Sequence, residues 1–279
     1  MQQNDIGFLT FAQNSGTVDY LELAYLQAMN VKATNPEFKF AVIVDYPTSR
    51  AVTARHEKVF DHIIQKPLDI TNPMHNEWQA YWHSPFFETI KLEADLLFTR
   101  NISHWLQAFR LKEVVFSYGC RTYTDELATS RTYRQFIDDN ELPDIYNGLM
   151  YFRKGKEAEE FFTLAKNLYF NWKIITETAL INYREDKLST DFLYAVAAQL
   201  FGRERCTIPS LDYINFVHMK PDINKLSNDR AWYETVMHER DGDMIRINNL
   251  NQLNPVHYYD KNYATTELVK YYEQRLRLL

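Results

Sequence analysis

Glycine is scarce in this chain, and its spacing restricts the nucleotide-binding folds that the chain can adopt. Only 7 of the 279 residues are glycine, at positions 7, 16, 119, 148, 155, 202 and 242. A Walker loop needs two glycines five residues apart, and a dinucleotide-binding fingerprint needs three within six residues. No two glycines here lie that close together. The sequence therefore excludes P-loop NTPases and standard Rossmann dehydrogenases.

Composition excludes several further classes of protein. Apolar residues make up 46 % of the chain, which is enough for a sizeable core. Cys120 and Cys206 form no CxxC pair, so we expect free buried thiols in a cytoplasmic protein and no thiolate zinc site. No run approaches the ~20 apolar residues of a membrane span, and the N-terminus lacks a basic signal-peptide region. The net charge of −6 argues against a large basic face.

Short apolar runs alternate with segments of helical periodicity through the first part of the chain. This alternation predicts an α/β fold with a mostly parallel central sheet flanked by helices. We expect a core over residues 1–203 and an irregular C-terminal segment, 204–279, that completes the active site of one compact domain. The predicted strands are 6–12, 38–45, 61–64, 88–98, 114–116 and 145–152, and the predicted helices are 19–31, 50–60, 157–169, 190–200 and a terminal one from about 265.

Two acidic residues interrupt an otherwise apolar segment. Glu93 and Asp95 lie two positions apart, so in a strand both carboxylates would point to the same face. Adjacent carboxylates repel each other unless a cation lies between them, and Mg²⁺ or Mn²⁺ accepts such oxygens. The pair therefore indicates a metal site, although solvated acids at the end of a strand would give the same pattern.

Other polar residues fall where strands or helices begin. Asn147-Gly148 leads into an apolar strand, where glycine permits close approach of a ligand or is simply part of a turn. Asp191 lies in the first turn of a predicted helix, which also suits the helix dipole. Two histidines precede lysines, as His218 with Lys220 and His257 with Lys261. Either pair could supply a metal ligand and a phosphate contact, and the residues alone leave the choice open.

The order of these features resembles that of the GT-A glycosyltransferases, in particular the glycogenin-like nucleotide-sugar transferases, over about residues 5–262. The segments LEADLLF, NGLMYFRK, FVHMKP and PVHYYDK also resemble glycosyltransferases carried by large tailed phages, for which the cytoplasm would be that of the host. Two departures from the family pattern stand out. The first acid of the metal motif is Glu93 rather than Asp, and Asn147 is followed directly by Gly148.

The resemblance implies a GT-A-like fold and a hexosyl- or pentosyltransferase that uses Mn²⁺ or Mg²⁺ and a nucleoside-diphosphate sugar. Asp95 and His257 would bind the metal, and Asn147 and Asp191 would face the donor sugar as catalytic residues. The residues implied in donor binding are Thr10, Phe11, Asp45, Lys91, Glu93, Gly148, His218, Lys220 and Lys261.

The sequence alone does not identify the molecule that supplies the acceptor hydroxyl. Phage-carried transferases commonly modify a hydroxymethylated pyrimidine of DNA, so DNA is one candidate partner, against which the acidic net charge counts. A nucleotidyltransferase is an alternative, but Gln13-Asn14-Ser15-Gly16 is a weak match for the Gly-rich loop that such enzymes use. A non-catalytic binding module on a transferase fold is a third interpretation, and measured donor hydrolysis would separate it from the first.

Overall fold

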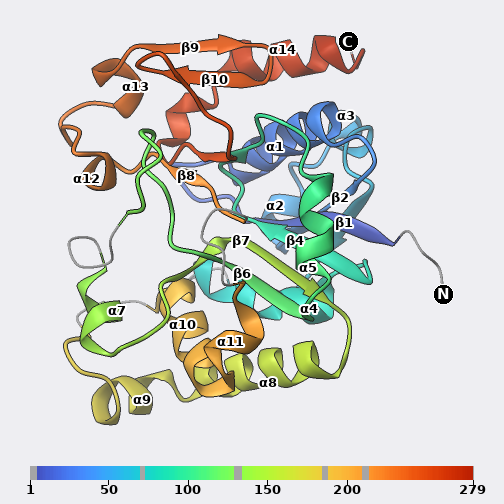
Figure 1. The fold of residues 1–279 in the computed structure, drawn as a ribbon. Helices are drawn as coiled ribbons and strands as arrows, with labels where there is room; N and C mark the ends of the chain where they lie inside the picture. Colours follow the sequence, from blue (N-terminus) through green and yellow to red (C-terminus); the bar gives the residue numbers. More distant parts are fainter. Residues whose placement is uncertain (1–4, 70–72, 129–133, 184–187, 209–213, 279) are drawn as a thin grey trace.

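A six-stranded sheet forms the centre of the molecule (Figure 1). The structure is a computed structural model and describes residues 5–69, 73–128, 134–183, 188–208 and 214–278. The strand order is β3-β2-β1-β4-β7-β6; β7 pairs antiparallel with both β4 and β6, and the other pairs are parallel. The strands are β1 (Ile6–Ala12), β2 (Lys39–Val44), β3 (His62–Gln65), β4 (Glu88–Leu92), β6 (Val114–Tyr118) and β7 (Ile145–Arg153). The predicted mostly parallel sheet is confirmed.

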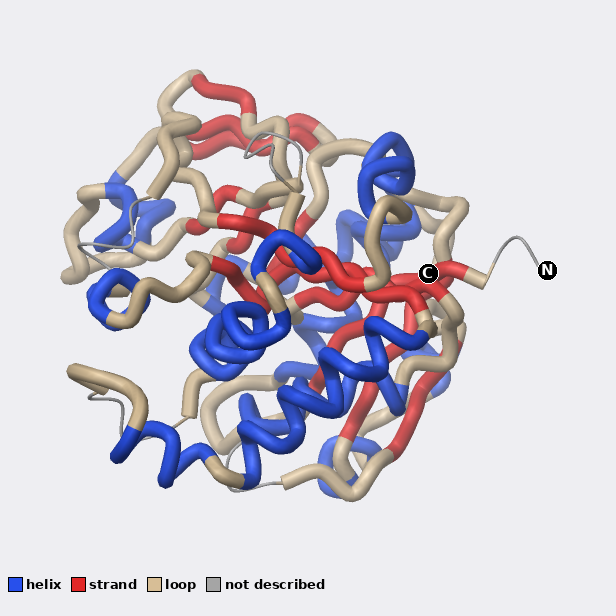
Figure 2. Tube along the Cα trace, turned by 60° about the horizontal axis from the view of Figure 1, so that its bottom comes forward, coloured by secondary structure: helices blue, strands red, loops and turns tan. Residues whose placement is uncertain are grey.

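Helices cover both faces of this sheet (Figures 1 and 2). On one side lie α1 (Tyr20–Thr34) and α14 (Thr266–Arg275), and on the other lie α8 (Lys156–Phe170) and α10 (Thr190–Phe201). Successive side chains of a strand point to opposite faces, so β1 contributes Phe8 to one buried cluster and Leu9 to the other. A strand buried on both faces is largely apolar, which is why β1 is an apolar run in the sequence, with Thr10 as its one polar residue.

The longer helices begin and end where the sequence provides capping residues. Asp19 precedes α1, and its carboxylate accepts a hydrogen bond from the backbone N–H of Glu22 at 3.0 Å. Gly202 ends α10 with a φ of +104°, a conformation that few other residues adopt. The predicted helices 19–31, 157–169 and 190–200 are therefore confirmed to within about three residues at each end.

Two predicted elements are wrong. The segment 88–98 is not one strand, because β4 ends at Leu92 and the chain turns before it enters a second sheet as β5 (Leu96–Leu97). The segment 50–60 is not one helix but contains only α3 (Ala54–Glu57), which follows α2 (Tyr46–Ser49). The Asp45 carboxylate accepts from the N–H of Thr48 at 2.8 Å and so starts a helix earlier than the periodicity indicated.

The residues after 203 form two small sheets and several short helices. One sheet consists of β5, β12 (Val256–His257) and β8 (Val217–His218), so it joins the C-terminal residues to the chain that follows β4. The other consists of β9 (His238–Asp241), β10 (Met244–Ile247) and β11 (Leu250–Asn251). The short helices here are α11 (Arg203–Cys206), α12 (Pro221–Asn224), α13 (Trp232–Thr235) and the 3₁₀ helix η3 (Lys261–Tyr263).

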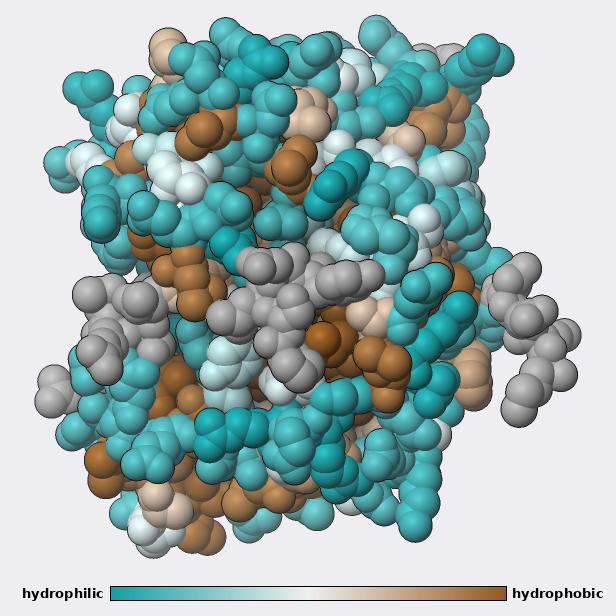
Figure 3. Space-filling view, viewed as in Figure 1, coloured by the Kyte–Doolittle hydropathy of each residue, from teal (hydrophilic) through white to brown (hydrophobic). Residues whose placement is uncertain are grey.

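The remaining elements are short and lie in the segments between strands, except for α9 (Trp172–Thr178), which lies between α8 and α10. The others are η1 (Pro73–Gln79), α4 (Ala80–His83), η2 (Ser103–Trp105), α5 (Leu106–Phe109) and α7 (Gln135–Asp139). No helix among the described residues is long and apolar enough to span a membrane. Hydrophilic side chains cover most of the face in Figure 3, and hydrophobic ones gather in smaller groups between them.

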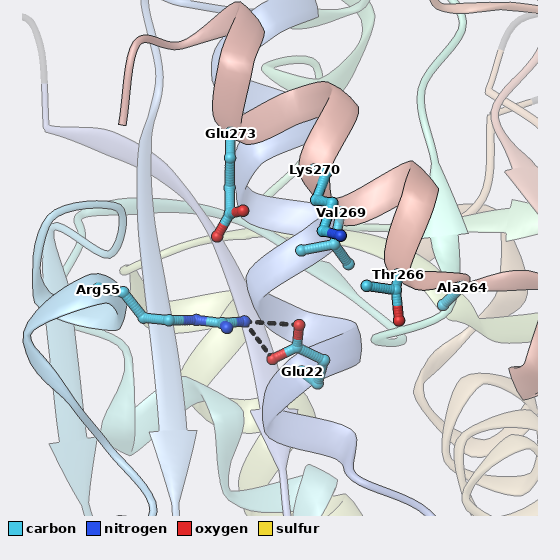
Figure 4. A pocket seen from close by; sticks show the side chains of 7 residues that line it. All are labelled: Glu22, Arg55, Ala264, Thr266, Val269, Lys270 and Glu273. Carbon is cyan, nitrogen blue, oxygen red and sulfur yellow. Dashed lines mark hydrogen bonds and ion pairs between the residues drawn. The ribbon is translucent and has the colours of Figure 1, made fainter. Parts of the chain in front are cut away.

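A small cleft of about 170 Å³ lies between α1 and α14 (Figure 4). Arg55 donates to the carboxylate of Glu22 at 2.6 Å, and Glu273 accepts a hydrogen bond from the hydroxyl of Tyr25 at 3.1 Å. The Arg55–Glu22 pair thus joins α3 to α1, and the bond between Tyr25 and Glu273 joins α1 to α14.

Candidate functional site

A cavity of about 490 Å³ opens beyond the C-terminal ends of β1 and β4. Ligands bind at this edge in open α/β sheets, because loops there diverge from neighbouring strands. Most of the residues that the sequence singled out line it: Phe11, Glu93, Asp95, Asn147, Gly148, Asp191, His218, His257 and Lys261. Residues from the N-terminal and C-terminal parts of the chain thus share one cavity wall.

Asp95 and His257, the two metal ligands that the resemblance implies, lie next to each other in the cavity. The Nε2 of His257 lies 2.8 Å from Oδ2 of Asp95 and 3.3 Å from Oε2 of Glu93. The ammonium group of Lys261 also contacts Asp95. Register in the small sheet brings these groups together, since His257 is paired with Leu96 and the N–H of Tyr258 donates to the carbonyl of Asp95 at 3.0 Å.

The charges in this cluster shift one another's pKa values. Burial opposes ionisation of Asp95, but the charges of His257 and Lys261 outweigh it and hold the pKa of Asp95 well below its usual range. Burial raises the pKa of Glu93, and the charge of His257 offsets that rise only in part. Burial alone would lower the pKa of His257, but Asp95 and Glu93 raise it. Without a further cation, His257 and Lys261 therefore serve as the counter-charges of Asp95.

The donor atoms of this cluster fit a divalent metal ion. Glu93, Asp95 and His257 each offer a ligand atom, and these atoms lie within 4.8 Å of one another. Two carboxylates with one imidazole suit Mn²⁺ or Mg²⁺, which also accept water or phosphate oxygens. The Nδ1 of His257 is buried without a hydrogen-bond partner in the described part of the chain, so the ring is held mainly through its Nε2 side. These residues could therefore hold a cation with open positions.

A bulge in β7 presents Asn147 and Gly148 to the cavity. The pairing of β6 with β7 shifts between Phe116 and Ser117, so that the β7 residues between Tyr146 and Met150 have no partner on β6. Bulges often re-aim side chains next to active sites. A Cβ on Gly148 would lie 3.4 Å from the Glu93 carboxylate, which shows how closely the two segments approach.

Asp191 fixes the backbone of this bulge. It lies in the first turn of α10, and its Oδ1 accepts a hydrogen bond from the N–H of Asn147 at 2.6 Å. The carboxylate therefore does more than interact with the helix dipole, since it bonds to β7 at the cavity wall.

His218 and His257 lie side by side because β8 and β12 run parallel with these two residues in register. Their ring centroids are 4.4 Å apart, and both rings line the cavity. Burial, together with the charge of His257, keeps the pKa of His218 well below its usual value. His218 is therefore the neutral partner of the two, and His257 is the one that bonds to Asp95.

Four of the predicted donor-binding residues lie outside the cavity lining. Thr10 is buried in β1, and its hydroxyl donates to the carbonyl of Leu92 at 3.0 Å. Asp45 accepts from the side chain of Gln13 at 3.1 Å and caps α2. Lys91 is fully buried and pairs with Glu77, and Lys220 precedes α12. Thr10, Asp45 and Lys91 thus contact residues near the wall but do not form it.

Several lining residues were not singled out from the sequence, among them Gln13, Tyr20, Glu77 and Tyr259. Glu77 lies on η1, and burial raises its pKa to about 7, although Lys91 acts in the opposite direction. A short 3₁₀ helix has no apolar periodicity that could mark it in a sequence. Tyr259 lies between His257 and Lys261 in the chain. Its φ of +60° is uncommon for a residue other than glycine.

No protein-family model and no curated protein matches this sequence. Solved structures do resemble it. The galactosyltransferase LgtC, solved with donor and acceptor sugar analogs, matches with a TM-score of 0.53 at 13 % identity, over 95 % of this chain and 95 % of that one. The apo form of the glycosyltransferase GlyE of Streptococcus pneumoniae TIGR4 matches with a TM-score of 0.51 at 10 % identity, over 99 % of this chain and 64 % of that one. The predicted GT-A-like fold is confirmed.

Proposed function

We propose that this protein is a metal-dependent glycosyltransferase, which moves a sugar from a nucleoside-diphosphate sugar to an acceptor hydroxyl. One observation carries the proposal. Glu93, Asp95, His257 and Lys261 converge in one cavity at the C-terminal edge of a sheet whose fold is like that of LgtC. Two carboxylates, an imidazole and an ammonium group suit a substrate that combines a divalent cation with a diphosphate.

In this proposal, Asp95 and His257 hold the cation, with Glu93 beside it. A divalent cation bound there would stabilise the negative charge that develops on the leaving diphosphate. Lys261 lies against Asp95 and is 29 % exposed, so its ammonium group can turn toward the diphosphate when Asp95 has another counter-charge. Preorganised positive charge of this kind is usually the largest contribution to such catalysis.

Asn147, Gly148 and Asp191 would surround the donor sugar. During transfer the bond from the sugar carbon to the diphosphate oxygen breaks, a bond to the acceptor oxygen forms, and the acceptor loses its proton. Asp191 is the carboxylate that we assign to this step, as proton acceptor for an inverting reaction or as a neighbour of the departing sugar for a retaining one. Both roles need the carboxylate at the cavity wall, where it lies.

For the acceptor, the sequence resemblance suggests a hydroxymethylated pyrimidine of phage DNA. The acids Glu77, Glu93, Asp95 and Asp191 line the cavity and would repel DNA phosphates. A single base or sugar that enters the cavity meets less of this repulsion than a duplex does. Hydroxymethylated DNA and small sugar acceptors should therefore be assayed side by side.

The test is a screen of sugar nucleotides with and without Mn²⁺, read by thermal shift and by release of nucleoside diphosphate. Stabilisation and diphosphate release that both need Mn²⁺ support the proposal. Release of pyrophosphate when a nucleoside triphosphate and a sugar 1-phosphate are supplied instead would identify a nucleotidyltransferase, and binding of a sugar nucleotide without turnover would identify a non-catalytic module. Glu22→Gln, in the cleft between α1 and α14, is the matched control, because Glu22 lies outside this cavity.

A further inference from the structure

Glu77 contributes a carboxylate to the cavity wall that the proposed reaction does not use. Its side chain is 15 % exposed, and its Oε2 contacts both the ammonium group of Lys91 and the side-chain nitrogen of Asn147. The hydroxyl of Tyr194, on α10, donates to the Glu77 carbonyl at 3.0 Å. Glu77 is thus fixed at both its backbone and its side chain.

The chemistry of these contacts sets the orientation of the Asn147 amide. An ammonium group only donates hydrogen bonds, so the Oε2 atom that faces Lys91 is an acceptor. The part of the Asn147 amide that faces this oxygen must then be its NH₂ group. The amide oxygen of Asn147 consequently points away from Glu77.

That amide oxygen is the one polar atom of Asn147 left over. The N–H of Asn147 donates to Asp191 at 2.6 Å, and its carbonyl accepts from Lys91 at 3.2 Å. Its Oδ1 is buried and has no hydrogen-bond partner among the residues that the structure describes, and the whole residue is only 3 % exposed. Buried acceptors are normally paired, so this oxygen indicates a ligand group that donates a hydrogen bond.

We infer that Glu77 is a positioning residue, which with Lys91 holds the Asn147 amide so that its oxygen selects a donor sugar by a hydroxyl that donates a hydrogen bond. The inference rests on the proposed function, because it assigns the ligand at Asn147 to the donor sugar. The donor sugar must then carry one hydroxyl that cannot be replaced by a group of similar size that only accepts hydrogen bonds.

The first test needs no donor. In ¹⁵N-labelled protein, the side-chain NH₂ signal of Asn147 should shift in Glu77→Met, which has no acceptor, and should stay nearly unchanged in Glu77→Gln, which keeps an acceptor oxygen. Because Glu77→Met leaves the ammonium group of Lys91 buried and unpaired, the double variant Glu77→Met with Lys91→Met is measured as well. An Asn147 signal that is the same in the wild type and in both Met variants overturns the positioning role.

The second test uses UDP-glucose and UDP-galactose, each with the hydroxyls at C2, C3, C4 and C6 replaced in turn by fluorine, which cannot donate. With Mn²⁺ present, we expect the wild type to bind one fluoro analogue of the better donor at least about tenfold more weakly than the parent, as for a lost hydrogen bond to a buried group. This preference should persist in Glu77→Gln and fall to about threefold or less in the Met variants. Affinity for UDP alone should stay within about twofold of the wild type throughout.

The outcomes separate the two ideas. Equal affinity of the wild type for every fluoro analogue, or an unchanged preference in both Met variants, overturns the inference while the proposed function stands. Absence of binding by any sugar nucleotide in the screen described above overturns the proposed function, and the hydroxyl selection with it.

Discussion

Asp95 is the residue on which the proposed chemistry depends most. We predict that Asp95→Asn lowers sugar transfer or donor hydrolysis at saturating Mn²⁺ by at least ~10³-fold, because a lost cation removes several kcal/mol of transition-state stabilisation. Activity within tenfold of the wild type would contradict the metal role. Glu22→Gln, outside the cavity, should stay close to the wild type.

The same substitution should also change stability. Asp95 is only 4 % exposed and is the shared partner of His257 and Lys261. Its pKa is held low, so its carboxylate stabilises the fold above its usual pKa, and this contribution is lost as the pH falls. Activity must therefore be expressed per folded protein, with urea unfolding as the control, because removing one member of a buried ion pair is destabilising.

His257 gives the metal site a pH dependence. Its pKa is raised above the usual value near 6.5, so in the metal-free protein it is protonated and stabilises the fold at low pH. That contribution is lost as the pH rises through the raised pKa. A metal ligand must be deprotonated, so we predict that apparent Mn²⁺ affinity rises with pH through this pKa, by up to about tenfold per pH unit, and then levels off.

Calorimetric titration of Mn²⁺ between pH 6 and 8.5, in buffers of different ionisation enthalpy, measures both the affinity and the protons released. In His257→Gln the remaining affinity should be weak and nearly independent of pH over this range. A wild-type affinity that is flat from pH 6 to 8.5 would show that the metal does not displace a proton from His257.

At the scale of elements, the β7 bulge sets the distance between Gly148 and Glu93. A Cβ at position 148 would lie 3.4 Å from both the Glu93 carboxylate and the ring of Phe216, an ordinary contact distance. We predict that Gly148→Ala keeps activity within about threefold, whereas the extra methyl groups of Gly148→Val crowd Glu93 and lower activity at least tenfold. Overpacking of this kind typically destabilises by about 1–3 kcal/mol.

Activity and Mn²⁺ affinity are measured for both variants together with unfolding in urea. The comparison is informative because the two side chains differ only in methyl groups. Equal loss in Gly148→Ala and Gly148→Val would mean that backbone freedom at the bulge, rather than space beside Glu93, is what glycine provides.

Periodicity predicted the long elements well and the turns poorly. β1, α8 and α10 each bury a continuous or one-sided set of apolar residues, and such patterns are visible in a sequence. The turn at Glu93–Asp95 was predicted as strand because Leu96 and Leu97 continue the apolar run. Those two leucines instead pair with Val256 and His257, about 160 residues later, and no local pattern records such a contact.

In the candidate site, too, some residues could be predicted from the sequence and others could not. Glu93, Asp95, Asn147 and His257 stand out by residue type and spacing, and their order resembles that of a known family; the structure brings them into one cavity. Glu77 was missed because a lone acid in a short polar segment has no distinguishing signal. Its position becomes informative only when Lys91 and Asn147 are seen to contact it.

At the scale of the whole molecule, the C-terminal residues supply part of the cavity and part of the core. β8 and β12 pair in one sheet with β5, which follows β4, and α14 packs against α1. Tyr272 on α14 is fully buried and accepts a hydrogen bond from Asn30 of α1 at 2.8 Å. Residues 204–279 therefore share contacts with the first part of the chain rather than forming a core of their own.

We therefore predict a single cooperative unfolding transition in urea, with coincident curves by tryptophan fluorescence and by circular dichroism. Tyr272→Ala should lower the free energy of unfolding by about 3–5 kcal/mol, as expected for removal of a large buried ring, without splitting the transition. Its neighbour Tyr271 is 36 % exposed, so Tyr271→Ala is the matched control, with an expected loss below about 1 kcal/mol. If residues 204–279 folded independently, Tyr272→Ala would produce two separate transitions, and donor binding would be lost at the first of them, because His257 and Lys261 lie in that segment.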